Sequence, residues 1–167
     1  MTQDWTTPDW SREVPRRFWD PSRQLLQAIR AYQKTGTGPV HALRRKIAVL
    51  RHRFWSVISQ AEIDLGASIG GGLLLPHPNG IVIHPKSEIG PNCLLFQQVT
   101  LGTREGHTGA PRLGVHVDVG AGARILGPVH IGDHAVVGAN AVVLSDVPAH
   151  ATVVGIPAKI LKRKETP

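Results

Sequence analysis

The fold is decided by residues 113–143, which read LGVHVDVGAGARILGPVHIGDHAVVGANAVV. Within this stretch an aliphatic side chain returns at every sixth position, at Leu113, Val119, Ile125, Ile131, Val137 and Val143. A helix turns every 3.6 residues and a strand alternates every two, so neither element explains a period of six. The stretch therefore predicts a repeat architecture in which consecutive units stack on one another.

Each six-residue unit has the composition of one side of a triangular solenoid. Glycine follows the aliphatic residue in most units, and alanine often precedes it by two positions. Three units per coil give short parallel strands on three flat sides, with the aliphatic residues inside and glycine at the tight corners. Each coil buries its apolar face only against its neighbours. We therefore expect a mainly β fold, a parallel β-helix over residues 59–161; the unbroken period disfavours a Gly-rich β-sandwich.

The same period extends towards the N-terminus with two interruptions. The upstream positions are Ile63, Ile69, Leu75, Ile83, Ile89, Leu95 and Leu101. The step from Leu75 to Ile83 is two residues too long, and a polar, Gly-rich segment at 102–111 separates the upstream units from the downstream ones. We expect both segments to project from the coil, and projecting segments on rigid scaffolds commonly line binding sites.

Residues 1–58 lack the period and predict a helical cap. Asp20-Pro21 reads as an N-cap followed by proline at the first helical position. We expect one helix from there to about Gly36 and a second from about Pro39 to Trp55. The second has an apolar stripe of the kind that packs against the rest of a protein, at Leu43, Ile47, Leu50 and Phe54. The aromatic residues that precede the helices are expected to anchor this segment or seal the solenoid end, and they are Trp5, Trp10, Phe18 and Trp19.

The chain of 167 residues is basic, with a formal net charge of +7. The basic residues concentrate in the second expected helix, at 44–53, and in a tail at 162–167, outside the repeats. No nucleic-acid motif accompanies them, so we expect a solvated helix face and no nucleic-acid partner. A nucleic-acid or anionic-membrane binder that uses the basic helix is the alternative, and its binding would weaken steeply with salt.

Nothing in the sequence indicates a secretory leader or an integral membrane span. The first residues are polar and acidic, whereas a signal peptide is basic and then apolar. The single cysteine, Cys93, stands in an apolar setting and is expected to be a small buried hydrophobe and not a nucleophile. One thiol cannot form an internal disulfide, which agrees with a reducing compartment. We expect a cytoplasmic protein.

His77 is the candidate general base. It lies in the segment Pro76-His77-Pro78, at the one position where the upstream period gains two residues. The prolines hold the imidazole rigidly, and histidine titrates near neutral pH, so a positioned His77 can take a proton from a hydroxyl. The alternative is a surface histidine in a turn.

A carboxylate that holds the second ring nitrogen of His77 would fix its tautomer. Glu62 stands fifteen residues earlier, about one coil away, and is the candidate; Asp64 competes with it, and both would otherwise be solvated corner residues. In the second projecting segment, Arg104 and His107 are candidates for contact with an acceptor or with phosphates, or else belong to a mobile tip.

The C-terminal part of the chain resembles a known family. The run from about Ser59 to Leu161 is similar to the serine acetyltransferases and the related sugar and polysaccharide O-acetyltransferases. The similarity lies in the segments IGGGL at 69–73, GIV at 80–82, QVTLG at 98–102, VGAGA at 119–123, GANAVV at 138–143 and VGIPAK at 154–159. The resemblance covers about three-fifths of the chain. It implies left-handed coils, an acyltransferase and acetyl-CoA as donor. The sequence itself has no cluster with metal-ligand spacing, so we expect no metal, and His130 and His134, which lie within a repeat unit, are expected at the surface.

The resemblance also assigns residues. It puts His77 on the catalytic histidine and Glu62 where the family has the orienting Asp. It implies a homotrimer with active sites between adjacent solenoids, and CoA held along that groove at Gly102, Thr103, Ala121, Ala139, Gly155 and Lys159. Asp20 resembles the Asp-Pro that opens the family's last N-terminal helices and is included as an acceptor-binding residue with Arg104 and His107. Lys159 would meet the 3′-phosphate of CoA.

Three positions depart from the serine-specific members. Those members have an Asp directly before the catalytic histidine and an Arg-His pair before the strand after the loop; this chain has Pro76, Gly109 and Ala110. The loss of these charged partners predicts a sugar or polysaccharide hydroxyl as the acceptor, with L-serine as the alternative. A non-catalytic hexapeptide scaffold is the alternative from another class, and its zinc-dependent forms require three histidine ligands.

Overall fold

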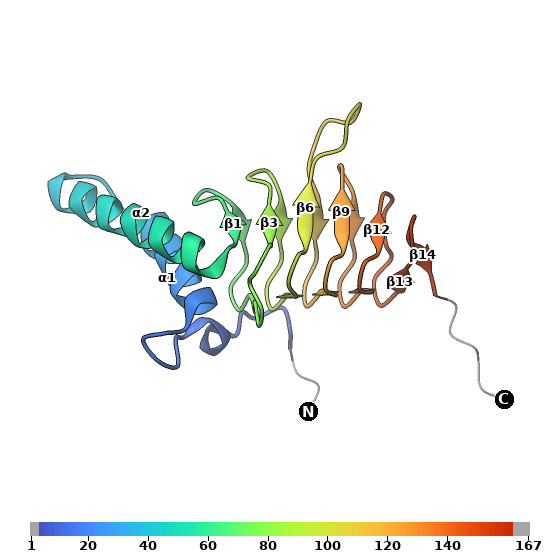
Figure 1. Ribbon diagram of the computed structural model, residues 1–167, viewed down its shortest axis with the longest axis horizontal. Helices are drawn as coiled ribbons and strands as arrows, with labels where there is room; N and C mark the ends of the chain where they lie inside the picture. The colour runs from blue at the N-terminus through green and yellow to red at the C-terminus, as the bar shows by residue number, and fades with distance from the viewer. Residues whose placement is uncertain (1–3, 162–167) are drawn as a thin grey trace.

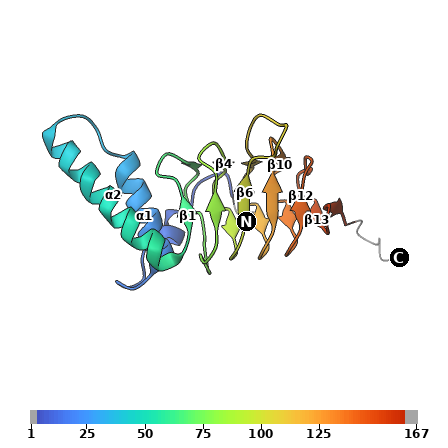
Figure 2. The same ribbon diagram turned by 45° about the horizontal axis from the view of Figure 1, so that its top comes forward.

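A computed structural model describes residues 4–161, so the basic tail expected at 162–167 lies outside the described residues. In this range the chain forms helices followed by a parallel β-solenoid (Figure 1). The helices are the 3-10 helix η1 (Trp10–Glu13), α1 (Pro21–Gln33) and α2 (Pro39–Ser59). Both α-helices lie at one end of the solenoid and extend beyond it (Figures 1 and 2).

The strands form the three sides of the solenoid. Side A contains β1 (Glu62–Ile63), β3 (Val82–Ile83), β6 (Thr100–Gly102), β9 (Arg124–Leu126) and β12 (Val142–Val143). Side B contains β2 (Ser68–Ile69), β4 (Glu88–Ile89), β7 (Arg112–Leu113) and β10 (His130–Ile131). Side C contains β5 (Leu94–Leu95), β8 (Asp118–Val119), β11 (Val136–Val137), β13 (Thr152–Val154) and β14 (Lys159–Ile160). All pairs are parallel except β13 with β14, which confirms the expected parallel solenoid.

The residues that recur at every sixth position form the hydrophobic core. Val119, Ile125, Ile131 and Val137 are fully buried, and each pairs with its counterpart one coil away. The interior alanines Ala123, Ala135 and Ala141 are equally buried. A slim triangular interior leaves room for one branched residue per side and a small neighbour, so the pattern follows from volume.

The role expected for the repeat glycines is wrong. Gly90, Gly120 and Gly132 do not adopt the positive φ of a tight corner. A Cβ at these positions would instead meet the backbone of the next coil, 2.3 Å from the Gly114 oxygen, 2.6 Å from the Ala139 nitrogen and 2.4 Å from the Ala149 nitrogen respectively. They are glycine because neighbouring coils approach closely there.

The left-handed corner positions carry side chains at Asn92, Gln98, His116, His134, Asn140 and His150 and glycine at Gly72, Gly80 and Gly122. Three of these form a histidine column along one edge. The ring centroids of His134 and His150 are 4.9 Å apart and stacked, those of His116 and His134 are 5.3 Å apart, and Trp5 covers His116 at 3.7 Å. His134, expected at the surface, is therefore half-buried in this column.

The segment before α1 runs along the solenoid and does not seal its end. The Asn92 side chain accepts a hydrogen bond from the Asp9 amide (2.8 Å) and donates to the Trp5 and Thr7 carbonyls. Trp10, Phe18 and Trp19 are half-exposed or more, so of the two expected roles they do not seal the solenoid end; the other role, anchoring this segment, fits Trp5, whose ring lies 3.7 Å from that of His116.

The apolar stripe of α2 does not pack within this chain either. Leu43, Ile47, Leu50 and Phe54 are each about half exposed, whereas Ala48 and Trp55, on a different face of the helix, are buried. A heptad-like stripe on a sequence does not reveal which side of a helix meets the core when both sides carry apolar residues. No helix within residues 4–161 is both long enough and apolar enough to cross a membrane.

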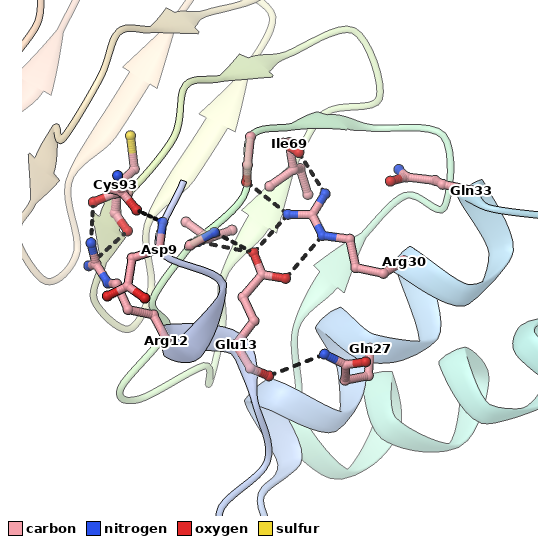
Figure 3. Close-up of polar contacts among 12 residues, drawn as sticks. Asp9, Arg12, Glu13, Gln27, Arg30, Gln33, Ile69 and Cys93 are labelled. Carbon is pink, nitrogen blue, oxygen red and sulfur yellow. Dashed lines mark hydrogen bonds and ion pairs between the residues drawn. The ribbon is translucent and has the colours of Figure 1, made fainter. Parts of the chain in front are cut away.

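A buried ion pair fastens the helical part to the solenoid (Figure 3). Both Glu13 oxygens accept hydrogen bonds from Arg30, at 2.8 and 3.0 Å. Oε1 of Glu13 also accepts from the amides of Gly72 (2.8 Å) and Leu73 (3.1 Å), and Arg30 donates to the Ile69 carbonyl (2.6 Å). The pair thereby anchors the first coil just ahead of the Pro76-His77-Pro78 segment.

Candidate active site

His77 lies at the corner that leads from side C to side A. Leu74 still pairs with Leu94 on side C, and the chain reaches side A at β3. The extra residues between them are tied to the neighbouring coils, because the Gly80 amide donates to the Gln60 carbonyl (2.8 Å) and the Asn79 carbonyl accepts from the Gln98 amide (2.9 Å). The imidazole is exposed at this rigid corner.

A hollow of about 590 Å³ adjoins this corner. We call it the acceptor hollow; it is lined by Arg16, Arg17, Trp19, Asp20, Pro21, Ser22, Arg23, Leu74, Leu75, Pro76 and Pro78. Both prolines that flank His77 are in its wall, and so is Asp20 at the start of α1. Asp20 and the two prolines that flank His77 therefore line the same hollow, and the roles of Asp20 and His77 stay predictions. The sequence analysis did not predict the arginines of this hollow. The two adjacent cations at 16 and 17, just before Asp20, could have indicated them.

Glu62 lies on the exposed face of side A, at the start of β1. It lines a different hollow, of about 640 Å³, which it shares with Asp64 beneath the C-terminal end of α2. Within residues 4–161, neither carboxylate is recorded in a hydrogen bond or ion pair with His77. The orienting role of Glu62 therefore stays a prediction, and Asp64 instead accepts from the Gly66 amide at 2.7 Å.

The segment at 103–111 projects from side A as expected, as the loop that rises beyond β6 in Figure 1. Arg104 and His107 are exposed on it. Nδ1 of His107 lies 3.1 Å from the Glu105 carbonyl oxygen, and the His107 amide donates to the Arg104 carbonyl (3.1 Å), so both residues belong to a local turn. The loop is a separate element from the acceptor hollow, and no hydrogen bond recorded for the described residues joins the two.

The expected CoA positions fall on two different edges of side A. Gly102 ends β6 at the edge towards side B, and Thr103 follows it into the loop. Ala121, Ala139 and Gly155 stack at the other edge, the corner that also carries His77; the Asn140 amide, for example, donates to the Ala121 carbonyl (2.8 Å). Lys159 is exposed on β14, opposite Val154, beside that second edge. A single chain therefore does not gather all these positions around one groove.

Cys93 is fully buried, and burial raises the pKa of its thiol to about 12, as expected for a structural cysteine. Within the described part of the chain, no group of three or more His, Cys, Asp or Glu side chains is arranged to hold a metal ion.

The parallel solenoid with its N-terminal helices identifies the class of protein. Several solved structures share it, among them a truncated serine acetyltransferase apoenzyme (TM-score 0.73, 33% identity, 86% of this chain and 59% of that one) and the soybean serine acetyltransferase apoenzyme (TM-score 0.72, 36% identity, 86% and 58%). The chain thus has the left-handed β-helix fold of the hexapeptide-repeat acyltransferases.

Curated sequences narrow the class to a family. A serine acetyltransferase of Helicobacter pylori strain J99 is 42% identical over 129 residues, which are 74% of this chain and 75% of the relative. The one from Synechococcus elongatus is 42% identical over 109 residues, 64% of this chain and 45% of the relative. The chain belongs to the serine acetyltransferase family, as its repeats and motifs predicted. It spans about half the length of several of these relatives, and no protein-family model matches it.

Proposed function

We propose that this protein is an acetyl-CoA-dependent O-acetyltransferase in which His77 is the general base. The observation that supports this most directly is the position of His77 between two prolines that both line the acceptor hollow, in a chain of an acyltransferase family. His77 takes the proton of the acceptor hydroxyl while the hydroxyl oxygen bonds to the thioester carbon. The carbon–sulfur bond then breaks, and the CoA sulfur leaves with a proton returned by His77, which restores the neutral imidazole.

The other parts of the mechanism use groups that the chain supplies. Backbone N–H groups stabilise the negative charge that develops on the thioester oxygen. Glu62 orients His77 once the groove is complete, because a carboxylate on the second ring nitrogen stabilises the imidazolium. The reaction needs no metal.

We further propose a homotrimer in which each groove lies between two copies. The expected CoA positions support it, because Gly102 and Thr103 lie at one edge of side A whereas Ala121, Ala139 and Gly155 lie at the other. A closed ring of three solenoids turns the first edge of one copy towards the second edge of the next. Small residues along such a groove let backbone amides approach the pantetheine arm, and Lys159 supplies a cation for the 3′-phosphate. The proposed donor and the single buried thiol also fit a cytoplasmic location.

For the acceptor, the comparisons favour L-serine over a saccharide. The curated relatives are named serine acetyltransferases, and one of them matches three-quarters of its own length. The expected preference for a sugar or polysaccharide hydroxyl rests on Pro76, Gly109 and Ala110 alone, and it has no support from the relatives' names. L-serine is therefore the first acceptor to assay.

The test is thiol release from acetyl-CoA with L-serine, homoserine and a panel of sugars. His77→Ala should lower kcat by a factor of about 10² or more, the usual contribution of a general base, with CoA affinity nearly unchanged by calorimetry. His130→Ala is the matched control, because His130 is exposed on β10 and its hydrogen bonds with Asp146 and Val147 use only its backbone amide and carbonyl. Retention of most activity in His77→Ala would overturn the mechanism.

A further inference from the structure

The acceptor hollow carries an excess of positive charge. Three arginines, Arg16, Arg17 and Arg23, line it, against a single carboxylate, Asp20. Arg16, Arg17 and Trp19 are exposed to solvent at its mouth. Clefts lined by one sign of charge raise the local concentration of ligands with the opposite sign.

Asp20 does not offset the two exposed cations, because its charge is already compensated within the chain. Its Oδ2 accepts hydrogen bonds from Nη1 of Arg23 and from the backbone amide of Arg16, both at 3.2 Å. Arg23 is held in this position by a second bond, from its Nε to the Arg12 carbonyl (2.7 Å). No ion pair of the described residues 4–161 includes the guanidinium of Arg16 or Arg17.

The first turn of α1 adds to the same potential. Pro21 is the first residue of this 13-residue helix and lies in the hollow with Ser22. The Asp20 side chain makes no capping hydrogen bond, so it does not occupy the first-turn amides. The N-terminal end of a helix carries partial positive charge and accommodates anions.

The lining residues of the segment at 74–78 offer a cation no charged partner, only backbone carbonyl groups. They are Leu74, Leu75, Pro76 and Pro78, none of which carries a charge or a side-chain acceptor. An acceptor with an ammonium group would therefore face two unpaired guanidinium groups and no free carboxylate. Burying a charge without a partner is costly, whereas an arginine can bind a carboxylate or phosphate through two parallel hydrogen bonds.

On the basis of the proposed function, we infer that the acceptor is an alcohol that carries an anionic group, a carboxylate or a phosphate, and that needs no ammonium. Arg16 and Arg17 bind the anionic group, and the hydroxyl to be acetylated reaches His77 past Pro76. L-serine is then used through its carboxylate alone, and amine-free hydroxy acids or phosphorylated alcohols are better acceptors.

The test compares acceptors that differ in one group. Wild-type protein with saturating acetyl-CoA is assayed for acetylated product with glycerol and glycerol 3-phosphate, with L-serine and glyceric acid, and with glucose and glucose 6-phosphate. We expect kcat/KM to be at least about tenfold higher for the anionic, amine-free member of each pair, equivalent to roughly 1.4 kcal/mol. Glyceric acid against glycerol 3-phosphate distinguishes a carboxylate from a phosphate.

Three variants connect the preference to the hollow. Arg16→Gln and Arg17→Gln should each raise KM for the anionic acceptors about tenfold and leave KM for acetyl-CoA unchanged. Arg53→Gln, an exposed arginine on α2 outside the hollow, is the matched control and should change neither. Pro76→Asp should shift the preference towards L-serine several-fold, because it supplies the missing carboxylate.

The two proposals fail in different ways. If neutral and anionic acceptors are acetylated equally and Arg16→Gln changes nothing, the inference about charge is overturned while the acetyltransferase stands. If no acceptor is acetylated, the proposed function fails, and calorimetric titration with glycerol 3-phosphate then decides the inference. Binding that both arginine variants weaken supports an anion site in the hollow, whereas no binding, or binding that they leave unchanged, overturns it.

Discussion

Replacing Glu13 by glutamine removes one charge from the ion pair that fastens the helical part to the solenoid. The side chains of Arg30 and Glu13 are 10% and 1% exposed, and four hydrogen bonds converge on the two carboxylate oxygens. Glutamine has the same shape, so the change isolates the charge from the packing. It also turns one acceptor into a donor that faces N–H groups.

The expected loss of unfolding free energy depends on the hydrogen bonds that Arg30 keeps in the variant. Removal of one partner from a buried pair costs about 3–5 kcal/mol, because the other charge stays buried without compensation. Arg30 still donates to the carbonyls of Ile69 (2.6 Å) and Gly70 (2.8 Å), which places the cost at the lower end, about 3 kcal/mol. For a chain of this size, that lowers Tm by roughly 6–12 °C.

The assay is urea unfolding followed by far-UV circular dichroism, at one fixed protein concentration because the midpoint of an oligomer depends on concentration. Glu88→Gln is the matched control. Glu88 and Arg112 form an ion pair at 3.3 Å, but their side chains are 50% and 66% exposed, so its loss should cost less than about 1 kcal/mol. If Glu13→Gln costs no more than Glu88→Gln, the reasoning from burial is refuted.

Three further predictions test the solenoid. Burial is the main cause that lowers the pKa of His116; the neighbouring His134 and Arg12 charges also lower it, and Asp118 opposes them. Protonation of His116 therefore favours the unfolded chain. The free energy of unfolding should fall as the pH drops below the ordinary histidine range. In His116→Asn, which tolerates the left-handed corner, the urea midpoint should change less between pH 7.5 and 5.5 than in wild type, and an equal change would contradict the assignment. Gly120→Ala should destabilise the fold by about 1–3 kcal/mol in the same urea assay, because its Cβ would lie 2.6 Å from the Ala139 nitrogen; an unchanged midpoint would show that the coils separate easily. Native Cys93 should resist iodoacetamide at pH 8 and react in urea, as mass spectrometry would measure, because burial raises its pKa to about 12; rapid labelling of the folded protein would contradict this.

The core and the architecture could be predicted from the sequence because the solenoid repeats in one dimension. A residue such as Ile125 contacts its own coil and the coils on either side, so its environment is encoded by residues at fixed sequence distances. The projecting loop and the Pro76-His77-Pro78 corner were visible for the same reason, since each breaks the period. The glycines were misinterpreted because their clash partners lie on the next coil, and period alone does not distinguish a close approach from a tight corner.

The helical part and the site required the tertiary structure. Residues 4–59 have no repeat, so nothing local specifies that Ala48 and Trp55 are buried while Leu43 and Phe54 are exposed. Asp20 and the prolines that flank His77 line the same hollow although they are more than fifty residues apart in the sequence, and only the fold places Arg16 and Arg17 there as well. The coil, its core and the candidate base His77 could be predicted because they depend on spacing along the chain. The charges that line the hollow beside Pro76 and Pro78 could not, because they depend on how the helices pack against the first coil.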